Sequence, residues 1–183
     1  MNDLRAGVVF KMNDEPYLIV WSNFLRMAQR KPVRQAKIKN LITGKILELS
    51  FKLDDKFEEA DVQRVKASYL YADDAAATFM DSSTFDQVSI ERENVKNVLP
   101  FLVEGAEVTL LLFEGKPIGV ELPKKVELKV TETMDATRGD TAQGSVMKDA
   151  TLETGGTIKV PMFIKTGDSI RVNTESGEYV ERV

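Results

Sequence analysis

The sequence predicts an all-β protein made of three small barrels, and three observations support this prediction. Short runs rich in Val, Ile, Leu, Phe and Tyr recur along the 183 residues, and Gly, Asn, Asp or Pro bounds each run. Two weak seams, at 54–61 and 133–138, divide the chain into three parts. A single short helix is expected, at 89–98 with Ser89 as its N-cap. Many short strands at this spacing are typical of barrels and sandwiches, and parts this small favour tight barrels.

The strands follow from these runs in chain order, with polar turn signals such as Asn13-Asp14 and Glu114-Gly115 between them. The expected strands are 7–12, 17–24, 33–42 and 45–51, then 65–71, 77–80, 107–114 and 116–122, and finally 126–133, 156–163, 168–173 and 177–183.

A basic segment stands out in an otherwise acidic chain. Residues 16–47 hold seven Lys or Arg and no Asp or Glu, whereas the rest of the chain holds 18 basic and 29 acidic residues. The strands predicted within this segment suggest a projecting basic hairpin. On its return strand Lys37 and Lys39 share one face, while Ala36 and Ile38 share the other. Such an arm either meets a dense anion, for example a nucleic-acid backbone, or is a solvated hairpin without a partner.

Composition argues against several kinds of chemistry. The chain has no Cys and no His, which removes disulfides, a thiolate nucleophile, the commonest general base and the commonest metal ligand. The paired acidic residues look like solvated turns, so we expect no catalytic residue, no metal site and no cofactor. No apolar run has the length of a membrane span, and no signal peptide is recognised. We therefore expect a cytoplasmic monomer without membrane contact.

The C-terminal part of the chain carries a set of fixed spacings. Its residues match the pattern K-x-A-x4-G-x2-[LIV]-x-V-P-x2-[LIV]-x2-G with every spacing intact, and the matching positions are Lys148, Ala150, Gly155, Ile158, Val160, Pro161, Ile164 and Gly167. Further motifs are Arg5-Ala6-Gly7, Glu15-Pro16-Tyr17, Leu41-Ile42-Thr43-Gly44, Tyr69-Leu70-Tyr71 and Ser176-Gly177-Glu178-Tyr179-Val180. Through these motifs the chain resembles bacterial translation elongation factor P over essentially its whole length.

This resemblance implies a fold and a function. The fold is an SH3-like (KOW-like) domain at 1–62 with a basic tip hairpin, followed by OB-fold domains at 63–127 and 128–183, arranged as an L. Such factors bind the ribosome between the peptidyl-tRNA and exit sites. They stimulate peptide-bond formation at consecutive prolines by positioning the peptidyl-tRNA, and they are not enzymes. The implied partners are both ribosomal subunits, peptidyl-tRNA and mRNA in the exit site.

The tip of the hairpin departs from the family pattern. Family members often carry a Lys there, in a Pro-Gly-Lys-Gly setting, or an Arg, and an enzyme modifies it. Ungapped alignment from either flanking motif places Gln29 at the tip, among Met27, Ala28, Arg30 and Lys31. We expect one of two situations. In the first, the tip is unmodified, Gln29 forms hydrogen bonds with the tRNA end, and Arg30 supplies a long cationic side chain. In the second, Arg30 or Lys31 carries a modification.

Further RNA contacts are expected along the hairpin and in the third domain. The phosphate contacts expected on the hairpin are Arg26, Arg34, Lys37 and Lys39, whereas Trp21 is expected to pack rather than to stack on a base. The resemblance implies that Gly139-Asp140-Thr141 meets the small subunit or the exit-site codon, although these residues also suit a plain turn. Tyr179 and Arg182 are additional candidates, and Tyr179 suits the barrel core equally well.

Other functions fit the residues less well. A hydrolase with paired carboxylates would lack His, a nucleophile elbow and a phosphate loop. A generic OB-fold RNA-binding protein would use a pattern of exposed aromatic residues, and the 8% of aromatic residues here form no such pattern. An elongation-factor-P-like paralogue is the alternative within the family.

Overall fold

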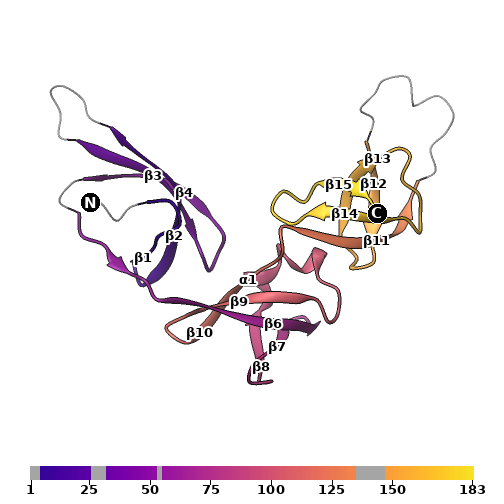
Figure 1. Cartoon of the computed structure of the whole chain (residues 1–183), viewed down its shortest axis with the longest axis horizontal. Helices are drawn as coiled ribbons and strands as arrows, with labels where there is room; N and C mark the ends of the chain where they lie inside the picture. The colour runs from indigo at the N-terminus through magenta and orange to yellow at the C-terminus, as the bar shows by residue number, and fades with distance from the viewer. Residues whose placement is uncertain (1–4, 26–31, 53–54, 135–146) are drawn as a thin grey trace. The chain divides into compact units, whose positions relative to one another are not determined.

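The structure is a computed structural model that describes residues 5–25, 32–52, 55–134 and 147–183 (Figure 1). Nearly all regular structure in these ranges is β, in three five-stranded sheets, so the predicted all-β class is confirmed. Two short helical segments interrupt it, α1 (Arg92–Val95) and the 3₁₀ helix η1 (Leu99–Phe101).

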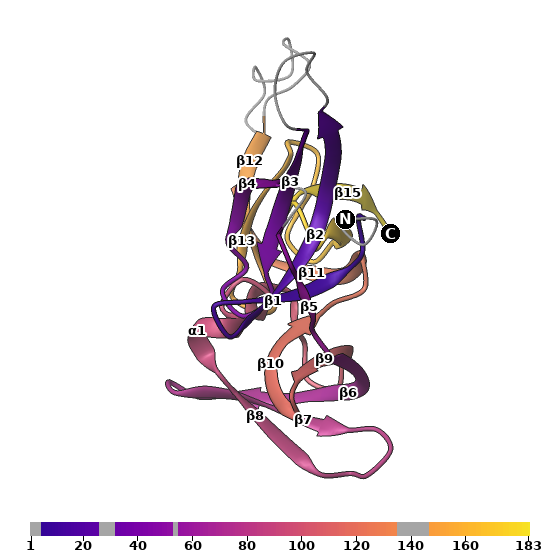
Figure 2. The ribbon, with the colours of Figure 1, turned by 90° about the vertical axis from the view of Figure 1, so that its left-hand side faces the viewer.

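The first sheet has the order β4-β3-β2-β1-β5. Its strands are β1 (Val9–Met12), β2 (Glu15–Leu25), β3 (Val33–Asn40), β4 (Ile46–Lys52) and β5 (Glu58–Glu59). Asn13 and Asp14 join β1 to β2 with φ angles of 53° and 63°, as a type I′ hairpin turn requires. Figure 2 shows β2, β3 and β4 side by side, and their pairing is antiparallel.

The chain divides into two compact units, and the first comprises Met1–Val65 with Leu110–Gly119. One core of this unit lies on the inner face of the first sheet, where Phe57 packs its ring edge-on at 5.3 Å from Phe10 and 5.0 Å from Phe51. The buried members of this core are Phe10, Tyr17, Ile19, Ala36, Ile38 and Phe51. A second cluster joins Leu41, Ala60, Leu111, Phe113 and Ile118.

The second sheet has the order β10-β9-β6-β7-β8. Its strands are β6 (Val62–Ala72), β7 (Ala76–Asp81), β8 (Gln87–Glu91), β9 (Glu107–Phe113) and β10 (Lys116–Glu121). Glu114 and Gly115 connect β9 to β10 with φ angles of 50° and 76°, a second I′ turn at a predicted position. The hairpin β9–β10 carries residues of both compact units.

The third sheet lies in the second unit, which comprises Lys66–Thr109 and Val120–Val183. Its order is β13-β12-β11-β14-β15, with β11 (Lys125–Thr133), β12 (Met147–Leu152), β13 (Thr157–Pro161), β14 (Ser169–Asn173) and β15 (Tyr179–Arg182). Five residues of the C-terminal signature belong to its core or its buried set, namely Lys148, Ala150, Ile158, Val160 and Ile164. The signature therefore includes much of a barrel core.

Two details of the predicted elements need correction. Ser89 is not an N-cap, because it lies within β8, where its hydroxyl is 3.3 Å from that of Thr78 on β7. Helix α1 begins only after β8, and its N-cap, Glu91, makes no side-chain capping bond.

The strands β5, β8 and β12 were not predicted. The domain limits 1–62, 63–127 and 128–183 stay a prediction.

Candidate nucleic-acid interface

The hairpin of β2 and β3 positions the basic segment. The two strands pair from Tyr17 opposite Asn40 to Leu25 opposite Val33. Residues of β2 are buried only in its first half, up to Ile19, while Val20, Trp21 and Phe24 are exposed. The distal half of the hairpin thus extends beyond the core. The expected tip residues Met27, Ala28, Gln29, Arg30 and Lys31, together with Arg26, lie outside the described residues.

The return strand has the two faces that its sequence predicts. Along β3, Gln35, Lys37 and Lys39 are exposed, and Ala36 and Ile38 between them are almost fully buried. We call the exposed side of β2, β3 and β4 the outer face. It consists of Trp21, Asn23, Gln35, Lys37, Lys39, Ile46, Glu48 and Ser50.

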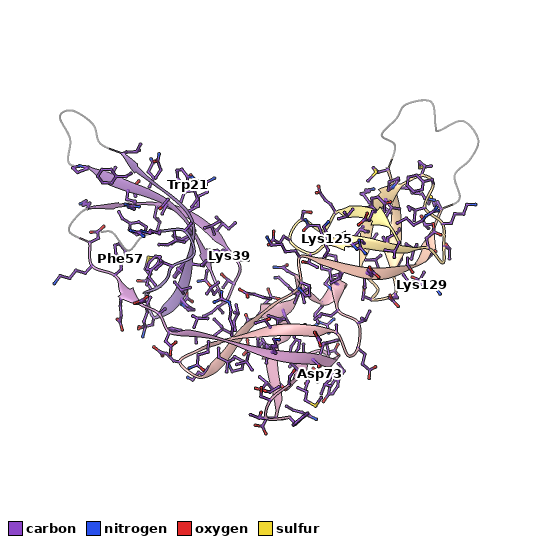
Figure 3. The ribbon with its side chains drawn as sticks, viewed as in Figure 1. Trp21, Lys39, Phe57, Asp73, Lys125 and Lys129 are labelled. Carbon is purple, nitrogen blue, oxygen red and sulfur yellow. The ribbon has the colours of Figure 1, made fainter. Side chains whose placement is uncertain are left out.

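A bulge in β2 places Trp21 on this outer face. Ile19 pairs with Ile38 and Trp21 with Lys37, so two steps on β2 match one step on β3, and Val20 is the extra residue. In a regular strand residues 19 and 21 would share a face, and both would enter the core. The bulge reverses this, and Trp21 is 45% exposed. Trp21, which was expected to pack, therefore lies on the outer face and not in the core. Figure 3 shows Trp21 and Lys39 toward one side of this sheet and Phe57 toward the other.

The cations of the hairpin differ in their surroundings. The Lys37 ammonium lies 2.8 Å from a carboxylate oxygen of Glu48 on β4, and both side chains are well exposed. Arg34 packs over the ring of Phe24 at 5.8 Å and donates to the hydroxyl of Ser22 at 3.3 Å. Within the described part of the chain, Lys39 has no ion pair. Lys39 is therefore the cation most available to an incoming anion.

The predicted contacts in the third sheet are only partly described. Gly139, Asp140 and Thr141 lie outside the described residues. Tyr179 packs, partly buried, against the third-sheet core, as one of its two expected roles requires. Arg182 is exposed, and its guanidinium lies 3.8 Å from the carboxylate of Asp168. Tyr179 and Arg182 belong to the second unit, whereas the described cations of the hairpin belong to the first.

The described residues hold little else that suggests a chemical site. No three acidic side chains among them are placed to hold a metal ion. A depression of about 370 Å³ in the second unit sets Lys66 against Glu107 and Glu121, a charge balance unsuited to a polyanion. No helix in the described ranges is long and apolar enough to cross a membrane.

Glu48, the partner of Lys37 in an ion pair, was not predicted from the sequence. The alternation of β4, with Leu49 partly buried and Glu48 and Ser50 exposed, was a signal that could have found it. Once the β3–β4 hairpin register is known, Glu48 must lie opposite Lys37.

Comparison with known proteins covers the whole chain. Residues 1–57 match the family model of the elongation factor P KOW-like domain, 62–120 that of the elongation factor P OB domain, and 126–182 that of the elongation factor P C-terminal domain.

Curated relatives give the same result. Elongation factor P of Aquifex aeolicus is 40% identical over 183 residues, which is 100% of this chain and 95% of the relative. Elongation factor P of Syntrophus aciditrophicus is 40% identical over 182 residues, covering 100% of this chain and 97% of the relative. Among solved structures, the eukaryotic translation initiation factor 5A from Methanococcus jannaschii aligns with a TM-score of 0.51 and 15% identity. That alignment covers 64% of this chain and 86% of the other, and it supports the fold alone.

Proposed function

Because this chain belongs to the elongation factor P family, we propose that it binds between the peptidyl-tRNA and exit sites of the ribosome and speeds peptide bonds between consecutive prolines. It is a translation elongation factor, and its partner is the ribosome. The observation that carries the proposal is the match of three family models, in order, along the full chain. In this proposal the protein acts as a cytoplasmic monomer without a cofactor.

The proposed mechanism needs no acid or base from the protein. Proline reacts slowly because its ring fixes φ and restricts the residue before it. A factor that holds the peptidyl-tRNA end near its attack geometry lowers the entropic part of the barrier, while the ribosome performs the chemistry. The lack of His and Cys in the sequence is compatible with such a positioning role, so we propose that the chain is not an enzyme.

The hairpin is the part that we propose meets the peptidyl-tRNA. Residues 16–47 carry no acidic side chain, and the exposed Lys39 lies on the outer face of β3. In the sequence, residues 26–32 lie between the end of β2 at Leu25 and the start of β3 at Val33. We propose that Gln29 and Arg30, in this segment, contact the tRNA end without modification. Arg26, Arg34, Lys37 and Lys39 contact phosphates in this proposal.

A second RNA contact belongs to the third domain in this proposal. Gly139, Asp140 and Thr141 meet the small subunit or the mRNA of the exit site, and Arg182 supplies a further cation. Arg182 is exposed and forms one long ion pair, so an RNA phosphate can replace the Asp168 carboxylate at little cost.

The tip assignment is tested with unmodified recombinant protein in reconstituted translation of a Pro-Pro-Pro reporter. We expect Gln29→Ala or Arg30→Ala to lower reporter synthesis while folding and ribosome binding stay close to those of the unmutated chain. If both variants support full synthesis, the tip assignment is wrong. Intact-mass analysis of native protein checks the unmodified state, because added mass on the tip peptide would contradict it.

A further inference from the structure

Trp21 lies on the half of β2 that extends beyond the core. It is the single Trp of the chain, and it is 45% exposed. The inner core is filled by other side chains, with Phe10 and Ile19 fully buried beneath the sheet. A bulge turns this large ring outward, and bulges commonly re-aim a side chain for a binding role.

The surroundings of the indole are polar and hydrogen-bonding. Trp21 lies opposite Lys37, and the next pair outward on the same face is Asn23 opposite Gln35. A shallow depression of about 230 Å³ opens here. It is lined by Trp21, Gln35, Ala36, Lys37, Glu48, Leu49 and Ser50. A flat aromatic surface with amide and hydroxyl groups beside it suits a nucleobase, which offers a π-face and a hydrogen-bonding edge.

The charges at this depression favour RNA over an acidic or apolar protein partner. The one carboxylate in its lining, that of Glu48, already lies 2.8 Å from the Lys37 ammonium. Two residues along the same strand face, about 7 Å away, the Lys39 side chain is exposed and has no ion pair within the described ranges. A base on the indole would therefore have cations on the strand beside it for its phosphates.

We propose that Trp21 is a stacking platform for one unpaired base of ribosome-bound RNA. Gln35 and Asn23 lie within reach of the base edge, and Lys37 and Lys39 contact the adjoining phosphates. This inference rests on the proposed function, because that function brings the outer face against RNA. It adds a contact in the strands of the hairpin, separate from the tip.

The affinity test compares Trp21→Ala and Trp21→Phe with a matched control, Tyr71→Ala. Tyr71 is a 55% exposed aromatic residue of the second unit, outside every proposed contact. The Kd for 70S ribosomes is measured by co-sedimentation at one fixed salt concentration, after thermal melting has confirmed that each variant folds. We expect Trp21→Ala to weaken binding about five-fold or more, Trp21→Phe to retain most of the affinity, and Tyr71→Ala to bind like the unmutated chain.

Ultraviolet crosslinking of the unmutated factor on ribosomes identifies the occupant. After nuclease and trypsin digestion, we expect the peptide of residues 12–26 to carry a nucleotide adduct that fragmentation locates on Trp21. A ribosomal-protein peptide joined to Trp21 instead would overturn the inference, as would an unchanged Kd for Trp21→Ala.

The same measurements separate this inference from the proposed function. If replacing Lys37 and Lys39 weakens ribosome binding while Trp21→Ala does not, the stacking role is wrong and the proposed function stands. If the unmutated chain fails to bind ribosomes at all, both are wrong.

Discussion

The ammonium of Lys37 is held by a carboxylate that an RNA phosphate would have to replace. The pair with Glu48 spans 2.8 Å between two exposed side chains, and exposed pairs of this kind stabilise a fold by about 0–1 kcal/mol. Exchange of Glu48 for a phosphate is therefore cheap.

Glu48→Gln should tighten ribosome binding. The substitution releases Lys37 and removes a negative charge from the outer face, so we expect the Kd to fall about two- to five-fold at moderate salt. Asp149→Asn is the matched control, because Asp149 forms an equally short pair, at 2.8 Å, with the exposed Lys159 in the second unit. Co-sedimentation of both variants measures the difference. If both variants gained the same ribosome affinity, the change in net charge alone would explain the gain, and the release of Lys37 would not.

Asn40 holds the turn at the base of the hairpin. It is 4% exposed, and its amide nitrogen donates to Glu15 at 2.7 Å. Its carbonyl oxygen accepts from the backbone N–H of Ile42 at 2.9 Å and of Thr43 at 2.8 Å. The family motif Leu41-Ile42-Thr43-Gly44 therefore depends on the residue that precedes it.

Asn40→Ala should destabilise the protein. It removes the hydrogen bonds to the backbone N–H groups of the half-buried Ile42 and the exposed Thr43, and the bond to Glu15. At about 0.5–1.5 kcal/mol for each hydrogen bond, the midpoint of thermal unfolding should fall by several degrees. Asn97→Ala, at an exposed position, should leave the melting temperature unchanged. Equal melting temperatures for the two variants would contradict the claim that Asn40 stabilises the turn.

Residue-level prediction from the sequence succeeds where the backbone is regular. The two faces of 35–39 follow from simple alternation, because β3 runs without interruption. The same alternation would place Trp21 on the inner face with Ile19, and the bulge at Val20 reverses this. A bulge depends on the pairing between strands, and the sequence of residues 17–24 contains no signal that predicts it.

At the level of elements, β3 holds Lys37 and Lys39, the two lysines that we propose contact RNA phosphates. In the double variant, Lys37→Gln and Lys39→Gln, ribosome binding should be weaker. The slope of log K against log salt should also become less steep by about 2, because two phosphate contacts are lost. Titrations at several salt concentrations measure the slope. An unchanged slope would show that neither lysine contacts phosphate. Replacing Lys125 and Lys129, exposed on β11 in the second unit (Figure 3), gives a control with the same loss of charge.

The strands that sequence reasoning missed have physical reasons in common. Strand β12 places Lys148 inward, where its ammonium donates to the backbone carbonyl of Met134 at 2.5 Å, so the strand does not read as apolar. Strand β8 alternates, but its polar residues suggested a helix start at Ser89. Strand β5 has only two residues, which is too short for any periodic signal.

At the level of the whole molecule, charge is distributed unevenly along the chain. The net charge is −4, yet residues 16–47 contain only basic charges. We expect this asymmetry to direct the basic hairpin toward RNA and to keep the acidic remainder away from it. The number of sheets was predictable from strand spacing and two seams. The limits of the domains do not follow from the sequence in the same way, because residues distant in the chain pack into one cluster. Leu41 lies in one cluster with Leu111 and Phe113.

The central claim is that the unmodified chain promotes peptide bonds between consecutive prolines on the ribosome. The most direct measurement is the rate of Pro-Pro-Pro synthesis in reconstituted translation, with and without recombinant protein whose mass matches the bare sequence. We expect a several-fold faster rate on the proline reporter and no change on a matched reporter without proline. Equal rates with and without the protein, at concentrations where it co-sediments with ribosomes, would contradict the account.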